Sequence, residues 1–211
     1  MVSTTALLGV ALLELGMVLT PGPNMVYLAS RSISQGRGAG LVSLAGVAVG
    51  FLCYLVAAAC GLSALFEQVP AAYTVVKLAG AAYLAYLAWG MLRPGGASPF
   101  DARELAPHSR PRLFTMGLMT NLLNPKIALL YAALLPQFIS PTSGSTLTQF
   151  VQLGAVQIVI AVAVNGLIVL GAAKVSGYLR EHPRAMRTQR FISGTVLGAF
   201  AAKMAVSHRP S

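Results

Sequence analysis

Long apolar runs alternate with short polar segments along the whole chain. An apolar run of about 20 residues is enough for a helix to cross a hydrocarbon core of about 30 Å. The runs are also too uniformly apolar for the alternating pattern of barrel strands. The sequence therefore predicts an all-α polytopic membrane protein with six transmembrane helices, the sixth being the shortest, over residues 5–30, 37–67, 71–92, 113–139, 147–173 and 191–206.

Composition supports a membrane protein and excludes an ordinary soluble domain. Of the 211 residues, 56% are hydrophobic and only 9% are charged, whereas soluble domains carry about 25% charged residues. The net charge of +10 could indicate nucleic acid or anionic lipid. The charges lie in short loops between apolar runs, so we expect a lipid bilayer as surroundings and no nucleic-acid partner.

Basic residues gather in every second predicted loop. Residues 31–37, 93–112 and 174–190 contain many Lys and Arg residues, while the second and fourth loops contain none. Cytoplasmic loops carry the excess of Lys and Arg. We therefore expect a multi-pass protein of the cell membrane with cytoplasmic basic loops and both termini outside, although Lys203 and Arg209 run against this orientation.

Two predicted spans contain helix-breaking motifs of similar design. The first span reads "LTPGPN" and the fourth reads "MTNLLNPK", so each places Thr-x-x-x-Asn beside a proline, as Thr20 and Asn24 and as Thr120 and Asn124. Proline removes a backbone donor, and an unpaired polar group in lipid costs several kcal/mol. We therefore expect helices 1 and 4 to be broken, with the breaks facing each other inside the protein and these side chains supporting the freed backbone.

The matched breaks suggest an internal repeat. Residues 1–92 and 113–211 each hold three predicted spans, and the polar linker 93–112 separates them. An odd number of spans per half inserts the second half upside down, giving two inverted three-helix repeats. Paired interruptions in such halves indicate a transporter binding site. The alternative is a pair of proline kinks that only shape packing.

Two ionisable residues lie deep in these broken spans. Lys126 is fourteen residues past Arg112, and a cation at a helix centre costs about 2.5–3.5 kcal/mol. It either takes part in a transport site or is a snorkelling or structurally paired lysine. Glu14 could carry a proton or pair with Lys126; the alternative is a protonated or interfacial glutamate.

Cysteine, histidine and glycine positions limit other chemistry. Cys53 and Cys60 are seven residues, or about 10 Å, apart on one predicted helix, which is too far for a disulfide. The histidines lie in loops or the tail, so we expect no metal site, no cofactor and no enzyme activity. The G-x-x-x-G spacing of Gly46 and Gly50 favours helix packing within the chain, and a homodimer is the alternative.

Four stretches resemble the lysine exporter family, the LysE/RhtB-type amino-acid efflux proteins. They are "LTPGPNMVYLASRSISQGRGAG", "AGVAVG", "LAGAAYLAYLAWG" and "NLLNPKIALLYAALLPQF". The resemblance implies an exporter of amino acids or their derivatives that is driven by the proton gradient. Glu14 matches no family motif, so its role as a proton-coupling group rests on its depth and charge. The implied transport site consists of Pro21, Gly22, Pro23, Asn24, Asn121, Asn124, Pro125 and Lys126.

Two other functions are alternatives to amino-acid export. The same fold could export a small metal cation, but the membrane spans contain one glutamate and no histidine, which is a poor ligand set for a metal. A related branch of redox proteins places cysteine pairs on the first and fourth spans. Here both cysteines fall on the second span, so the residues for that chemistry are missing.

Overall fold

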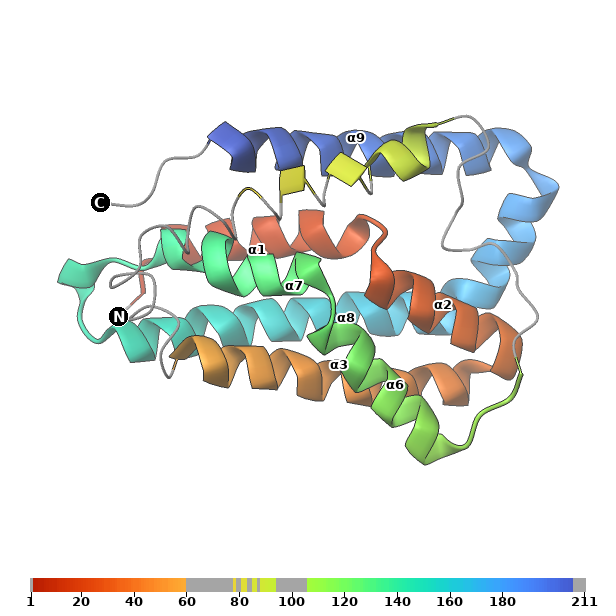
Figure 1. The fold of residues 1–211 in the computed structure, drawn as a ribbon, viewed down its shortest axis with the longest axis horizontal. Helices are drawn as coiled ribbons and strands as arrows, with labels where there is room; N and C mark the ends of the chain where they lie inside the picture. The colour runs from red at the N-terminus through yellow and green to blue at the C-terminus, as the bar shows by residue number, and fades with distance from the viewer. Residues whose placement is uncertain are drawn as a thin grey trace.

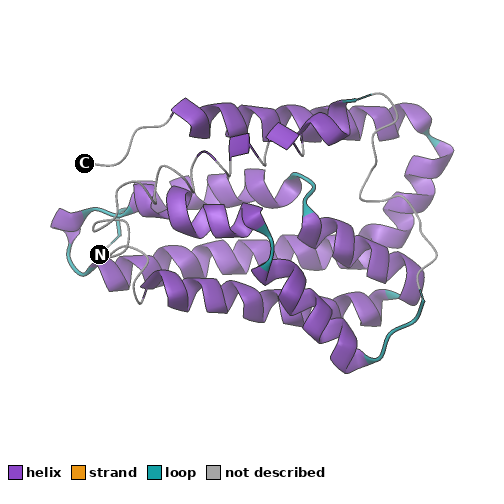
Figure 2. Ribbon diagram, in the orientation of Figure 1, coloured by secondary structure: helices purple, strands orange, loops and turns teal. Residues whose placement is uncertain are grey.

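A computed structural model gives the fold for residues 2–59, 78, 81–82, 85–86, 88–93 and 106–206. Every regular element within these ranges is a helix, as Figure 2 shows. This confirms the all-α prediction for the described part of the chain. Most of the predicted third span, most of the linker, and Cys60 lie outside the described residues.

The helices follow one another with short connections. Several are interrupted, and a π turn and a 3₁₀ turn continue the second broken helix. In chain order the elements are α1 (Thr4–Leu19), α2 (Pro23–Gln35), α3 (Arg37–Ala57), α6 (Arg110–Leu122), α7 (Pro125–Leu129), η2 (Leu130–Leu134), η3 (Leu135–Phe138), η4 (Pro141–Ser143), α8 (Thr146–Glu181) and α9 (Pro183–Val206).

The first predicted break separates α1 from α2, and the two helices are bent by 54°. Thr20 ends α1, and both its backbone N–H and its hydroxyl donate to the Met17 carbonyl, at 3.2 and 2.7 Å. Gly22 precedes α2, and Pro23 occupies its first turn, where a missing N–H costs nothing. The Thr20 hydroxyl thus supplies a second donor to the backbone at the end of α1.

The second predicted break lies between α6 and the segment that begins with α7, bent by 47°. Asn124 caps α7, because its side chain accepts a hydrogen bond from the Lys126 backbone N–H at 3.1 Å. Backbone bonds close the rest of the gap, from Asn124 N–H to the Asn121 carbonyl and from Leu123 N–H to the Met119 carbonyl. The backbone and the Asn124 cap thus satisfy this break without help from the Thr120 hydroxyl.

Glycines let α3 and α6 cross in direct backbone contact. A Cβ atom on Gly46 would lie 2.0 Å from the Phe114 carbonyl oxygen, and one on Gly117 would lie 2.1 Å from the Ser43 carbonyl oxygen. Only glycine allows two backbones to approach this closely. The preference for packing within the chain at the G-x-x-x-G motif is therefore confirmed.

The predicted ends of the last two spans are wrong. The sequence predicts a loop over residues 174–190, but α8 continues to Glu181 and α9 begins at Pro183. Lys and Arg are good helix formers, so the basic residues do not end the helix. The chain leaves the helix at His182, where the following proline disfavours helical backbone.

Two helices, α3 and α8, are long and apolar enough to cross a membrane. Each bent pair adds one more span if it is counted as a single broken helix, which gives up to four within the described residues. The helix α9 is not among them, since its first turns carry Arg184, Arg187 and Arg190. The chain is a helical, multi-pass membrane protein, and the sixth predicted span stays a prediction.

The basic segments share one end of the molecule. In Figure 1 the end of α2, the start of α6 and the turn between α8 and α9 lie together, opposite the start of α1 and the end of α9. Arg31, expected in a loop, instead lies buried on α2, because α2 runs on to Gln35. Its Nη1 donates to the Ala106 carbonyl at 3.1 Å. The described parts of the three basic segments thus lie at the same end of the molecule.

Gln35 joins α2 to the segment before α6 through two hydrogen bonds. Its Nε2 donates to the His108 carbonyl at 2.7 Å, and its Oε1 accepts from the His108 N–H at 3.0 Å. Gln35→Leu should therefore raise the hydrogen-exchange rate of the His108 amide about 3- to 10-fold, since a hydrogen bond contributes about 0.5–1.5 kcal/mol. Gln137→Leu, which removes a local bond to Ala133, is the control, and equal rates in the two variants would contradict the expectation.

Candidate functional site

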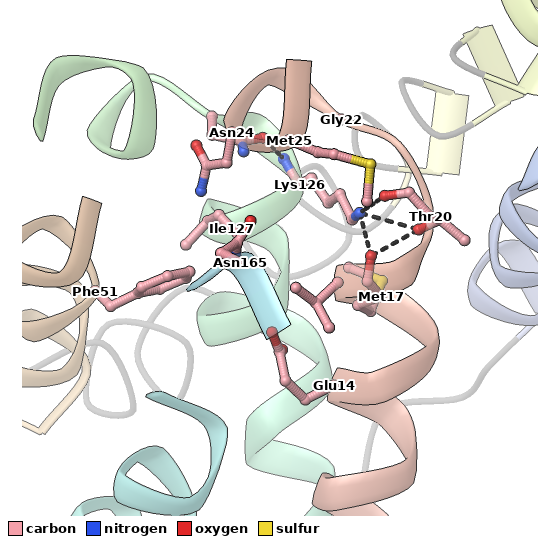
Figure 3. A pocket seen from close by; sticks show the side chains of 12 residues that line it. Glu14, Met17, Thr20, Gly22, Asn24, Met25, Phe51, Lys126, Ile127 and Asn165 are labelled. Atoms are coloured by element: carbon pink, nitrogen blue, oxygen red, sulfur yellow. Dashed lines mark hydrogen bonds between the residues drawn. The ribbon is translucent and has the colours of Figure 1, made fainter. Parts of the chain in front are cut away.

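A cavity lies where the two broken helices meet. Figure 3 shows its side chains, which come from α1, α2, α3, α7 and α8. Part of the wall is apolar and part is amide or charged. The lining residues are Glu14, Met17, Val18, Thr20, Gly22, Asn24, Met25, Phe51, Asn124, Lys126, Ile127 and Asn165.

Lys126 connects the two breaks. It is buried on α7, and its ammonium group donates to the Met17 carbonyl, to the Thr20 carbonyl at 2.8 Å and to the Thr20 hydroxyl at 2.9 Å. Figure 3 shows these contacts at the end of α1. A lysine has three donors, so all are used. The ammonium also lies at the C-terminal end of α1, where the helix dipole favours a cation.

This arrangement excludes one of the interpretations of Lys126. It does not snorkel, because it is buried among cavity residues. It is held by the backbone of the opposite break rather than by Glu14. In this conformation it offers its positive charge to the cavity but no free N–H.

Gly22 makes room for the Lys126 side chain. A Cβ atom at this position would lie 3.3 Å from Lys126 Cδ and 3.5 Å from its Nζ. The Gly22 backbone is extended, a conformation open to any residue. The glycine is therefore needed for space beside the lysine and not for its backbone freedom.

Glu14 lies in the same cavity, on α1. Only 2% of its surface is exposed, and its Oε2 atom has no hydrogen-bond partner among the described residues. Gln157 lies beside it on α8, and the Tyr131 hydroxyl donates to Gln157 Oε1 at 2.6 Å. Burying a carboxylate oxygen without a hydrogen bond costs free energy. Glu14 is therefore a candidate to bind a group that donates hydrogen bonds.

Two asparagines add acceptors to the cavity. Asn24 is 6% exposed, and its Oδ1 has no partner among the described residues. Asn165 on α8 donates from Nδ2 to the Ala161 carbonyl at 2.8 Å, which leaves its side-chain oxygen for the cavity. Asn165 was not predicted from the sequence. A usable signal existed, since Gln157 and Asn165 lie eight residues apart, on one face of the otherwise apolar stretch 153–173.

The structure brings together some of the predicted site residues and not others. Six of them line the cavity: Glu14, Thr20, Gly22, Asn24, Asn124 and Lys126. Pro21, Pro23 and Pro125 form the breaks themselves. Asn121 is fully buried against α3, where a Cβ atom on Gly50 would lie 2.7 Å from its Oδ1. Thr120 and Asn121 are not among the lining residues.

The cavity does not suit a metal cation. Its charged groups are one carboxylate and one ammonium, and divalent cations bind through several oxygen, nitrogen or sulfur ligands. Within the part of the chain that the structure describes, no three His, Cys, Asp or Glu residues lie close enough to hold a metal. Nothing in this site favours export of a metal cation.

Two interrupted helices that enclose a polar cavity within a helical membrane protein are typical of many transporters. Comparison with known proteins gives the family: the model of LysE type translocators matches residues 15–208. The chain therefore belongs to this family, as the resemblance of its motifs implied, and is a transporter rather than an enzyme. No solved structure shows a significant match.

Curated relatives cover almost the whole chain. A homoserine/homoserine lactone efflux protein of Salmonella typhimurium is 32% identical over 188 residues, 89% of each chain. A leucine efflux protein of Enterobacter sp. (strain 638) is 27% identical over 202 residues, 91% of each chain. An uncharacterized membrane protein of Vibrio cholerae is 31% identical over 182 residues, 85% of this chain and 87% of its own.

Proposed function

We propose that this protein exports amino acids across the cell membrane as a secondary active transporter. The observation that carries the proposal is the cavity between the two breaks, where an acid, a base and several amides line a small space with apolar walls. Such a lining suits a small molecule that is charged at one end and apolar at the other. The names of the efflux relatives support the same substrate class.

The charges of the cavity favour a neutral amino acid. Glu14 and Lys126 balance each other, so an additional charge on the substrate side chain would remain unpaired in a buried site. Met17, Val18, Phe51 and Ile127 supply apolar surface for a side chain. The relatives named for homoserine and leucine carry neutral amino acids in their names, which agrees with this preference.

Transport on this proposal uses alternating access. Six spans form two inverted repeats, over 1–92 and 113–211, and one repeat rocks against the other around the cavity. The basic loops face the cytoplasm and both termini lie outside. Lys126 holds the two breaks together on one side of the cavity, and its charge attracts the substrate carboxylate. Asn24, Asn121, Asn124 and the break prolines shape this side of the site.

Proton coupling on this proposal uses Glu14. It is the buried acid of the cavity, and a proton arriving there neutralises the charge that balances Lys126. A proton gradient directed inward would thus drive the exchange of a proton for the exported amino acid.

Export from loaded proteoliposomes tests the proposed function. Vesicles containing the purified protein are loaded with one radiolabelled amino acid from a panel of neutral, basic and acidic ones, and release is followed with and without a proton gradient. We expect release of neutral amino acids that accelerates with the gradient and is slowed about tenfold or more by Asn24→Ala, which removes a buried polar group of the site. Release no faster than from protein-free vesicles for every amino acid would refute the proposal.

A further inference from the structure

Two acceptors that line the cavity are not fully used. Glu14 Oε2 is buried without a hydrogen bond to described residues, although Gln157 lies beside this carboxylate, and Asn165, whose Nδ2 donates to the Ala161 carbonyl, lines the cavity. Buried polar groups in proteins are almost always paired. The unused acceptors, Glu14 and Asn165, therefore indicate a bound group that donates hydrogen bonds and is positively charged.

We propose that Glu14 and Asn165 form the subsite for the α-ammonium group of the substrate. The inference rests on the proposed function and adds which end of the amino acid binds where. An ammonium group brings three N–H donors and a positive charge, which match a carboxylate and an amide oxygen. Figure 3 shows the Glu14 carboxylate pointing to the cavity, on the side away from Asn24.

Lys126 sets the direction of the substrate. Its positive charge lies at the end of α1, next to Thr20 and Gly22, and repels an ammonium group at that side. The same charge attracts the carboxylate. The substrate thus lies with its ammonium group toward Glu14 and its carboxylate toward Lys126, and the apolar walls receive the side chain.

Gln157 and Tyr131 act as positioning residues for Glu14. The Tyr131 hydroxyl donates to Gln157 Oε1, which turns the Gln157 amide nitrogen away from Tyr131 and makes it available to the Glu14 carboxylate beside it. Tyr131 is itself held in the core, stacked on Tyr54 with ring centroids 5.6 Å apart. Gln157 on α8 thereby positions Glu14 on α1, and Asn165 on the same helix lines the cavity.

Exchange assays with a matched pair of substrates test the subsite. Leucine and its 2-hydroxy acid share skeleton and carboxylate, and differ in the ammonium group. Proteoliposomes loaded with either compound are used to measure its exchange without a gradient, for the wild type, Glu14→Gln, Asn165→Leu and Asn165→Asp. Glu181→Gln, at an exposed position of α8, is the control for loss of a carboxylate.

The expected result is a selective loss. Glu14→Gln and Asn165→Leu should slow leucine exchange about 10- to 100-fold, the effect of losing a charge-assisted hydrogen bond, and should slow hydroxy-acid exchange much less, so that the preference for leucine falls. Asn165→Asp keeps an oxygen acceptor and should keep the preference for leucine, as should Glu181→Gln.

Three outcomes would overturn the subsite. In the first, leucine exchange in Glu14→Gln equals that of the wild type, which leaves Glu14 a role in coupling alone. In the second, both compounds slow in parallel in Glu14→Gln and Asn165→Leu, the mark of a general structural defect. In the third, Asn165→Asp loses the preference as Asn165→Leu does. If the wild type exchanges no amino acid of the panel, the proposed function itself fails. If the wild type exchanges leucine but one of the three outcomes occurs, only the subsite fails.

Discussion

Lys126→Met should reduce amino-acid export at least a hundredfold while leaving the chain in the membrane. Methionine keeps much of the volume but none of the three hydrogen bonds to Met17 and Thr20. The buried Thr20 carbonyl is left without a partner among the described residues, which costs about 1–3 kcal/mol, while the Met17 carbonyl keeps its hydrogen bonds from Thr20. The carboxylate of the substrate also loses the charge that attracts it. Initial release rates from loaded proteoliposomes, scaled to the amount of folded protein, give the measurement.

Lys174→Met is the matched control for this effect. Lys174 lies exposed on α8, outside the cavity, so its replacement should leave the release rate within about twofold of wild type, as expected for a surface substitution. Export by Lys126→Met at the control rate would show that the link between the two breaks is not needed for transport.

Gly46→Leu should prevent α3 and α6 from packing and remove most of the folded protein. A Cβ atom at this position would lie 2.0 Å from a backbone oxygen of Phe114, and a backbone cannot move aside as a flexible side chain can. Overpacking commonly costs about 1–3 kcal/mol, and a backbone clash lies at or above the upper end of this range. The thermal midpoint of the detergent-solubilised protein, followed by size-exclusion chromatography, measures the loss.

Gly38→Leu on the same helix provides the comparison. No atom lies within 4 Å of a Cβ atom at Gly38, so this variant should elute as a single folded peak with a midpoint near that of the wild type. Equal midpoints for the two variants would contradict the close crossing of α3 and α6.

The two breaks could be predicted from the sequence because few residue types produce them. Proline and glycine inside an apolar run leave backbone groups that lipid cannot satisfy. A partner inside the protein was therefore required, and Lys126 is that partner for the end of α1. The prediction that the breaks face each other is confirmed by this contact.

The equivalence of the two motifs is less complete than the sequence suggests. Asn124 precedes its proline and caps α7, whereas Asn24 follows Pro23 and lies inside the first turn of α2 with an unpartnered oxygen. The one-residue difference in order between "PN" and "NP" gives the two side chains different tasks. In the sequence both motifs are Pro/Asn breaks. The backbone geometry distinguishes the asparagine that caps a helix from the one whose side chain faces the cavity.

The contribution of α8 was not predicted, and the spacing of its polar residues is only a weak signal. Gln157 and Asn165 carry no charge, break no helix and match no motif, and their importance comes from the elements they face. Such contacts between distant segments depend on packing, which one sequence does not reveal. The helix ends near residues 174–190 were missed for a related reason, since charge marks the edge of the membrane and not the end of a helix.

Protection of a cavity cysteine by substrate tests most directly that the cavity between the breaks holds the amino acid. Val18 lies in the apolar part of its lining, and Val18→Cys in a background with Cys53→Ser and Cys60→Ser supplies a single thiol. We expect a transported neutral amino acid at saturating concentration to slow labelling of this thiol by a small methanethiosulfonate reagent about tenfold, as mass action predicts at about ten times the dissociation constant. A labelling rate that stays the same with and without the transported amino acid would contradict a binding site in this cavity.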